Sequence, residues 1–132
     1  MGPQEGTLHW RIEDSMRAEA LGRFLEQLSG AHPDRQVILV MDQARSHKAK
    51  DLAVPENVSL EFLPPYSPEL NPVEILWHEL REKYCTNRVF DSLEGVCHRV
   101  ETGLSRFQSD PVSVLRLCRW PWIENGITMI AT

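Results

Sequence analysis

The chain has 132 residues, of which 42% are hydrophobic, and this is enough for one domain with a buried core. Its 14 basic and 19 acidic side chains give a formal net charge of −5, which excludes the overall basic surface of many nucleic-acid-binding proteins. DNA binding therefore requires basic residues that cluster locally, or a DNA-binding part elsewhere.

No export or membrane signal is found along the chain. There is no run of about 18 uncharged apolar residues, and the first residues lack the basic and apolar regions of a signal peptide. The three cysteines, Cys85, Cys97 and Cys118, are widely spaced, which indicates neither a disulfide framework nor a zinc site. We expect a soluble protein of a reducing cytoplasm, with no membrane partner.

The first elements can be predicted from hydrophobic spacing. Residues Thr7–Glu13 alternate apolar and polar side chains, which predicts a strand with one buried face. The apolar residues of Met16–Leu28 fall at helical spacing, and Ser29-Gly30 supplies a stop signal. The continuously apolar run Val37–Met41 predicts a strand that is covered on both faces.

The later elements follow the same logic. Alternation over Asn57–Leu63 predicts a third strand. The segment Pro64–Pro72 has four prolines in nine residues, which predicts an ordered turn. An apolar stripe predicts a helix from Val73 to about Tyr84, and two more helical patterns in Ser92–Cys118 are separated by Ser109-Asp110-Pro111.

This order of elements predicts an α/β fold. We expect a single domain over residues 1–132, with a short mixed sheet of about three strands and helices packed on it. Ligands of such sheets gather at the carboxyl ends of the strands. Asp42 directly follows the run Val37–Met41 and is therefore expected at this edge.

Two carboxylates are the main candidates for chemistry. Asp42 is placed where a metal ligand would be needed, but aspartate is equally common as the cap of a turn such as the one beginning at Gln43. Glu74 lies in the first predicted turn of its helix, where the helix dipole favours a carboxylate whatever its function. Its apolar neighbours and the rigid turn before it favour a fixed role.

Two histidines are secondary candidates. His47, five residues after Asp42, could orient a water molecule, contact a phosphate or position the aspartate. His78 lies one turn beyond Glu74 and would share its helix face. Such histidines are more often loop or core residues with a satisfied hydrogen bond.

Two segments, Val37–Lys50 and Leu60–Glu82, resemble the DDE transposases of bacterial insertion sequences in the mariner-like superfamily. The resemblance rests on a hydrophobic strand that ends in Asp, a histidine five residues later, and the string PPYSPELNPVE followed by LW. It covers about Gly6–Phe90, and the proline-rich string is its most specific part.

The resemblance implies an RNase H-like fold in which three carboxylates hold two divalent ions, Mg²⁺ or Mn²⁺. It assigns Asp42 to the family's second acid and Glu74 to the third, with His47 as an accessory. The implied activity is DNA transposition, with cleavage and transfer of strands at transposon ends and target DNA, in the bacterial cytoplasm.

The family's first aspartate has no match here, so we expect a partial RNase H-like fold with little activity alone. Glu13 and Asp14 are the only acids placed to substitute, and a solvent-facing turn or helix cap explains them as well. The missing acid could come from an upstream transposase polypeptide. The alternative is a non-enzymatic α/β module, derived from a transposase, that acts as a homodimer or a regulator.

Overall fold

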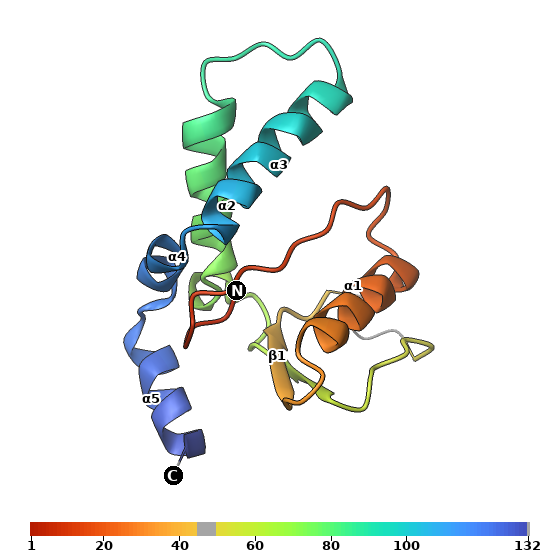
Figure 1. Cartoon of the computed structure of the whole chain (residues 1–132), viewed down its shortest axis with the longest axis vertical. Helices are drawn as coiled ribbons and strands as arrows, with labels where there is room; N and C mark the ends of the chain where they lie inside the picture. The colour runs from red at the N-terminus through yellow and green to blue at the C-terminus, as the bar shows by residue number, and fades with distance from the viewer. Residues whose placement is uncertain (45–49, 132) are drawn as a thin grey trace. The chain divides into compact units, whose positions relative to one another are not determined.

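The structure, a computed structural model, describes residues 1–44 and 50–131, with side chains up to residue 126. The chain divides into two compact units (Figure 1). One unit consists of Met1–His9 together with Pro72–Thr132, and the other of Trp10–Asn71. Each has its own buried side chains and is described by itself.

The unit Trp10–Asn71 contains helix α1 (Ala18–Ala31) and two strands, β1 (Val37–Met41) and β2 (Val58–Phe62). The strands pair in parallel over their full length, so their carboxyl ends lie at the same edge of the sheet. Both predicted strands are therefore confirmed. The buried side chains of this unit include Ala20, Leu25, Leu28, Met41, Val58 and Leu63.

The predicted amphipathic helix is confirmed as α1, but the predicted stop at Ser29-Gly30 is wrong. The helix continues to Ala31. The Ser29 hydroxyl donates to Asn57 Oδ1 at 2.5 Å, and the Asn57 amide donates to the backbone carbonyl of His32 at 2.9 Å. The end of α1 is thus fixed by a side chain that precedes β2, which local sequence could not indicate.

Strand β1 was expected to be covered on both faces, and this expectation is wrong. Ile38 is 51% exposed and Val40 is 46% exposed, whereas Met41 is buried. Their partners in β2 are the polar residues Ser59 and Glu61. One face of the sheet is therefore packed, and the other presents two apolar side chains from β1 beside two polar ones from β2.

The strand predicted at Thr7–Glu13 is absent, so the sheet described here has two strands and not about three. Thr7 makes only an isolated bridge with Gly2. Two backbone carbonyls of the segment accept hydrogen bonds from side-chain amides and not from a neighbouring strand. Gln108 donates to the carbonyl of Leu8 at 3.1 Å, and Gln27 donates to that of Trp10 at 3.2 Å. The segment is extended, but no strand of the described chain runs beside it.

The other unit is helical. It contains α2 (Val73–Leu80), the π-helical turn η3 (Arg81–Cys85), α3 (Leu93–Gln108), α4 (Pro111–Cys118) and α5 (Pro121–Ala131). The helix predicted over residues 73–84 is confirmed, with its last turn in π geometry. The two predicted helices of residues 92–118 are α3 and α4. Buried side chains here include Leu8, Leu76, Leu80, Tyr84, Leu104, Phe107, Val114, Cys118 and Ile123.

Two side chains begin these helices. Ser92 accepts a hydrogen bond from the backbone N–H of Gly95 at the start of α3, and Asp110 accepts one from that of Ser113 at the start of α4. Both satisfy donors that the first helical turn leaves without a partner. The break predicted at residues 109–111 is therefore an N-cap followed by a proline.

A close approach joins η3 to α3. A Cβ atom on Gly103 would lie 2.6 Å from Leu80 Cδ2 and 2.9 Å from Tyr84 Cδ2. Only glycine fits at this position without displacing one of these buried side chains. The glycine thereby brings Tyr84 directly onto α3.

Candidate metal centre

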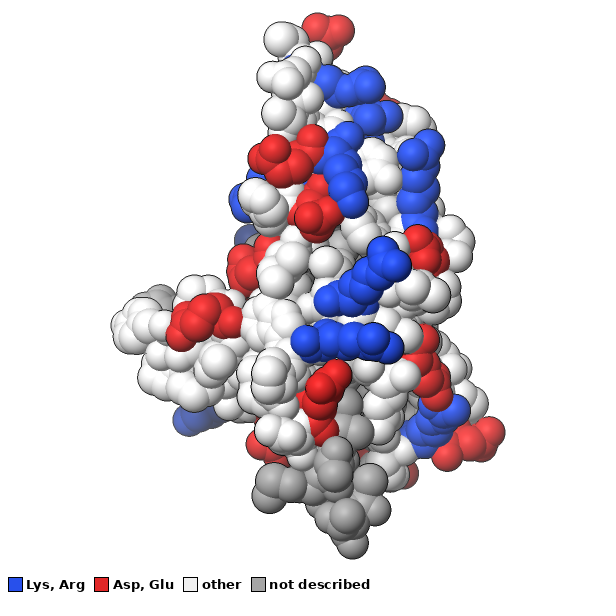
Figure 2. Space-filling view, turned by 90° about the vertical axis from the view of Figure 1, so that its left-hand side faces the viewer, with Lys and Arg blue, Asp and Glu red and all other residues white. Residues whose placement is uncertain are grey.

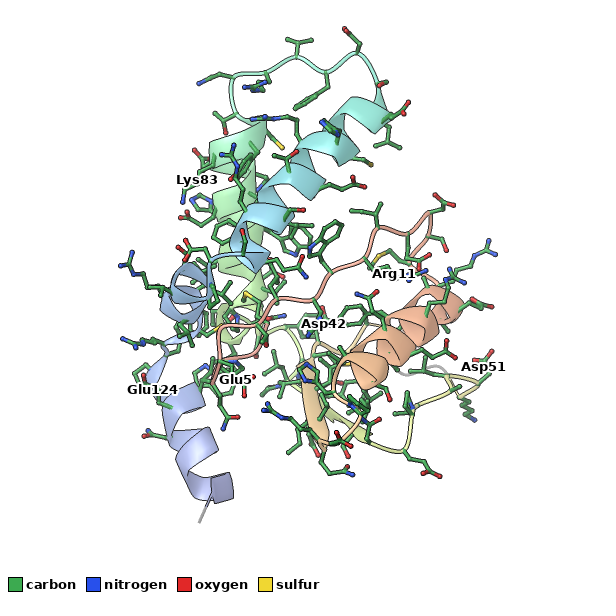
Figure 3. The ribbon with its side chains drawn as sticks, in the orientation of Figure 1. Glu5, Arg11, Asp42, Asp51, Lys83 and Glu124 are labelled. Atoms are coloured by element: carbon green, nitrogen blue, oxygen red, sulfur yellow. The ribbon has the colours of Figure 1, made fainter. Side chains whose placement is uncertain are left out.

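Asp42 is the first residue after β1, at the edge where the carboxyl ends of the two strands meet (Figure 3). Its Oδ1 accepts a hydrogen bond of 3.0 Å from the backbone N–H of Ala44. The Gln43 side chain donates to the carbonyl of Leu63 at 2.9 Å, which joins the segments that leave the two strands. Asp42 is exposed, so it caps a turn and also presents a carboxylate at the sheet edge.

Glu74 lies in the first turn of α2 and is exposed. The prolines before it form an ordered turn, as predicted, since Pro68 opens the short 3-10 helix η2 (Pro68–Leu70) and Pro72 is the N-cap residue of α2. Proline suits a helix start because no N–H is needed there. The helix dipole stabilises a carboxylate at this position whether or not it binds a ligand.

The two histidine candidates differ in what the structure describes. His47 lies outside the described residues. His78 is exposed on α2, one turn after Glu74, so the predicted sharing of a helix face is consistent with the geometry. No hydrogen bond is described between His78 and Glu74.

Glu13, a candidate to replace the acid that we expect to be missing, is engaged by two arginines. Arg23 donates to its two carboxylate oxygens at 3.0 and 2.7 Å, and Arg11 donates to the same group. The hydrogen bonds from Arg23 and then Arg11 lower the pKa of Glu13 to about 2. Its charge is therefore already matched by guanidinium groups, which argues against Glu13 as a metal ligand. Asp14 is exposed.

The two principal carboxylates belong to different units, Asp42 to Trp10–Asn71 and Glu74 to the helical unit. That the two carboxylates lie close enough to share a metal ion stays a prediction. Within residues 1–44 and 50–131, no three His, Cys, Asp or Glu side chains form a group that could hold a metal ion. Asp42 follows the end of β1 and Glu74 lies in the first turn of α2, and carboxylate oxygen ligands of this kind suit Mg²⁺ or Mn²⁺.

A group of basic side chains was missed from the sequence. Arg99 and Arg106 lie 5.5 and 5.8 Å from the centroid of the Tyr84 ring, and Lys83 lies 5.6 Å from that of Phe107. The two arginines are seven residues apart, which is two helical turns, and this spacing could have indicated a shared helix face. Nothing in the local sequence indicated that Tyr84 would lie against them.

Comparison with known proteins identifies the class. The chain belongs to the DDE superfamily endonuclease family, whose model matches residues 3–97. The match includes β1, β2, α2 and both candidate carboxylates.

One relative is an uncharacterized protein, y4pE/y4sA, of Sinorhizobium fredii (strain NBRC 101917 / NGR234). It is 33% identical over 106 residues, which cover 80% of this chain and 74% of the relative. No solved structure matches the chain. In the part of the chain that the structure describes, no helix is both long and apolar enough to cross a membrane.

Proposed function

We propose that this protein belongs to a DNA transposition system, in which a metal-dependent active site cuts DNA and joins the ends to a target. One observation carries the proposal. Within the family match, an exposed aspartate follows a strand of a parallel pair, and an exposed glutamate opens the helix after an ordered proline-rich turn. These are Asp42 and Glu74, and the parent fold would be RNase H-like.

The assigned roles follow from the chemistry of the donor groups. Asp42 and Glu74 would each hold a divalent cation, Mg²⁺ or Mn²⁺, through carboxylate oxygen. Two such ions, when bound, stabilise the attacking and leaving oxygens of an in-line phosphoryl displacement. The hydrogen bond from Ala44 orients the carboxylate of Asp42. The ordered turn fixes Glu74, and His47 would assist from the segment after Asp42.

The substrate would be DNA, namely transposon ends and target, in a bacterial cytoplasm. We expect the family's first acid to be missing from these 132 residues. A complete site would therefore need an acid from an upstream transposase polypeptide or from another copy of the chain. Glu13 is already held by Arg11 and Arg23, so of the two acids placed to substitute only the exposed Asp14 is left.

A second candidate is a non-enzymatic dimerisation or regulatory module derived from a transposase. The exposed apolar pair Ile38 and Val40 on β1 favours it, because such a face is suited to pairing with another chain. This candidate predicts no specific site for Mg²⁺ or Mn²⁺.

Binding of Mn²⁺, followed by electron paramagnetic resonance of the free ion, separates the two candidates. We expect Asp42→Asn and Glu74→Gln each to weaken binding by about tenfold or more, since even loss of a residue that supports a ligand costs this much. Glu94→Gln is the matched control, because Glu94 occupies the first turn of α3 as Glu74 does that of α2. If all three variants bind Mn²⁺ like the wild type, the metal site is refuted.

A further inference from the structure

The contact between η3 and α3 gathers positive charge around one buried aromatic ring. Tyr84 is buried, and Gly103 lets its ring lie against α3. Arg99 is one turn before Gly103 and Arg106 about one turn after it, so the three residues share a face of α3. The two guanidinium groups therefore flank the same ring, at 5.5 and 5.8 Å from its centroid.

The groups that contact the two arginines are uncharged and therefore do not neutralise the guanidinium charges. Arg99 donates from Nε to the backbone carbonyl of Tyr84 at 3.2 Å, and Arg106 interacts with the face of the ring. In the described part of the chain, neither forms an ion pair with a carboxylate, whereas Lys83 nearby pairs with Glu79 at 2.6 Å. Two guanidinium groups beside one ring, neither paired with an acid among the described residues, favour an anion.

Figure 2 shows Lys and Arg side chains interspersed with acidic side chains on the face that it presents. Lys83 projects from η3, as labelled in Figure 3. Its ammonium group lies 5.6 Å from the centroid of Phe107, the residue after Arg106. A chain of net charge −5 thus carries a local basic cluster of Arg99 and Arg106, here called the arginine pair. The charge of Lys83 beside it is matched by Glu79.

The geometry points to the sugar-phosphate backbone of duplex DNA as the ligand of this cluster. Guanidinium groups match phosphate oxygens with several N–H donors at once. Arg99 and Arg106 start two turns apart on α3, about 10 Å along its axis, so they suit separate phosphates of an extended polyanion better than one small anion. Such contacts position a protein on DNA without reading its sequence. The assignment rests on the proposed function, to which it adds a DNA-holding surface outside the metal centre.

The test is fluorescence anisotropy of the full chain with a labelled DNA duplex, without divalent metal, over a series of salt concentrations. The double variant Arg99→Gln/Arg106→Gln should bind about tenfold more weakly or worse at about 0.1 M salt. Its slope of log affinity against log salt should be shallower by about 1.8, which is about 0.9 for each lost phosphate contact. Arg106→Gln alone should give about half of the slope change. Arg106 is exposed, and its one described non-helical hydrogen bond is accepted by the backbone carbonyl, which the substitution keeps, so this variant should fold normally.

Arg88→Gln is the control for loss of charge alone, because Arg88 is an exposed arginine in the segment between η3 and α3. It should change affinity far less than the double variant does. An equal effect of Arg88→Gln, or no effect of the double variant, overturns the inference. So does a double variant that keeps its DNA affinity but loses self-association, since the cluster would then serve a protein partner.

Failure of this inference can be told apart from failure of the proposed function. The anisotropy experiment contains no divalent metal, and the Mn²⁺ experiment contains no DNA. Metal binding that depends on Asp42 and Glu74, together with DNA binding that ignores the arginine pair, would retain the function and refute only this surface.

Discussion

Gly103 on α3 lies directly against Tyr84 on η3, so that a Cβ atom at position 103 would come within 2.9 Å of Tyr84 Cδ2. Both residues are buried, and no space for a methyl group is left between them. The contact also sets the position of the ring that Arg99 and Arg106 flank. The packing of the helical unit and its surface charge therefore depend on the same glycine.

Gly103→Ala should destabilise the protein. Overpacking typically costs about 1–3 kcal/mol, and the better helix propensity of alanine offsets at most about 1 kcal/mol. We expect the free energy of unfolding in urea to fall by roughly 1–2 kcal/mol. Gly95→Ala on the same helix is the control, because its Cβ would meet only ordinary contacts at 3.7 Å. Equal stability of the two variants would contradict the close packing.

Glu13 should make the protein sensitive to acid. Its pKa is about 2 in the folded chain, against an ordinary value of 4.5. A lowered pKa means that the contribution to stability is fully present above about 4.5 and is lost as the pH falls from there towards 2. Glu13→Gln should therefore flatten this part of the profile of unfolding free energy against pH. Arg23→Gln should do the same, because it removes the guanidinium group that donates to both carboxylate oxygens of Glu13.

The chain purified alone should not nick or join DNA in the presence of Mg²⁺ or Mn²⁺. The reason is that we expect the family's first acid to be missing from this chain, and that Glu13 is held by arginines. Conversion of supercoiled plasmid to nicked circles is the measurement. Robust nicking that disappears in Asp42→Ala would show that another acid fills the role. Nicking that persists in Asp42→Ala would instead indicate a contaminating nuclease.

Self-association is expected through β1. The backbone N–H of Val37 and the backbone carbonyl of Met41 form hydrogen bonds on the β2 side of the strand. The backbone groups of the alternate residues Ile38 and Val40 therefore point to the opposite edge of β1. No third strand of the described chain pairs with that edge. Sedimentation at micromolar concentration should show a dimer. Val40→Lys should weaken it by about tenfold, or about 1.4 kcal/mol.

Val54→Lys is the control for that experiment. Val54 is an exposed apolar residue of the same unit, 40% accessible, but lies outside both strands. It should leave the dimer unchanged. A wild-type chain that sediments as a monomer at all accessible concentrations would exclude association through this edge.

The parts of the fold with strong local signals were predicted from sequence. Local pattern predicted strands β1 and β2 and the proline-rich turn before α2, and the structure confirms these elements. The failures involve partners distant in sequence. Leu8 and Trp10 bond to the side chains of Gln108 and Gln27 and not to a neighbouring strand. In addition, helical periodicity could not distinguish the π turn η3 from a further α-helical turn.

The candidate site divides in the same way. The positions of Asp42 after β1 and of Glu74 in the first turn of α2 follow from local pattern and are confirmed. Their approach depends on the arrangement of the two units, which no spacing along the chain encodes. The arginines around Tyr84 depend equally on a packing contact that Gly103 allows.

The extended segment from Leu8 to Glu13 is held by two kinds of interaction that respond differently to solution conditions. Neutral amides of Gln108 and Gln27 hold its first part, whereas an ionised carboxylate with Arg11 and Arg23 holds its end. Acid removes the charge of Glu13 but leaves the hydrogen bonds of the Gln27 and Gln108 side-chain amides intact. The segment should therefore open from its Glu13 end first, as a local event that precedes global unfolding.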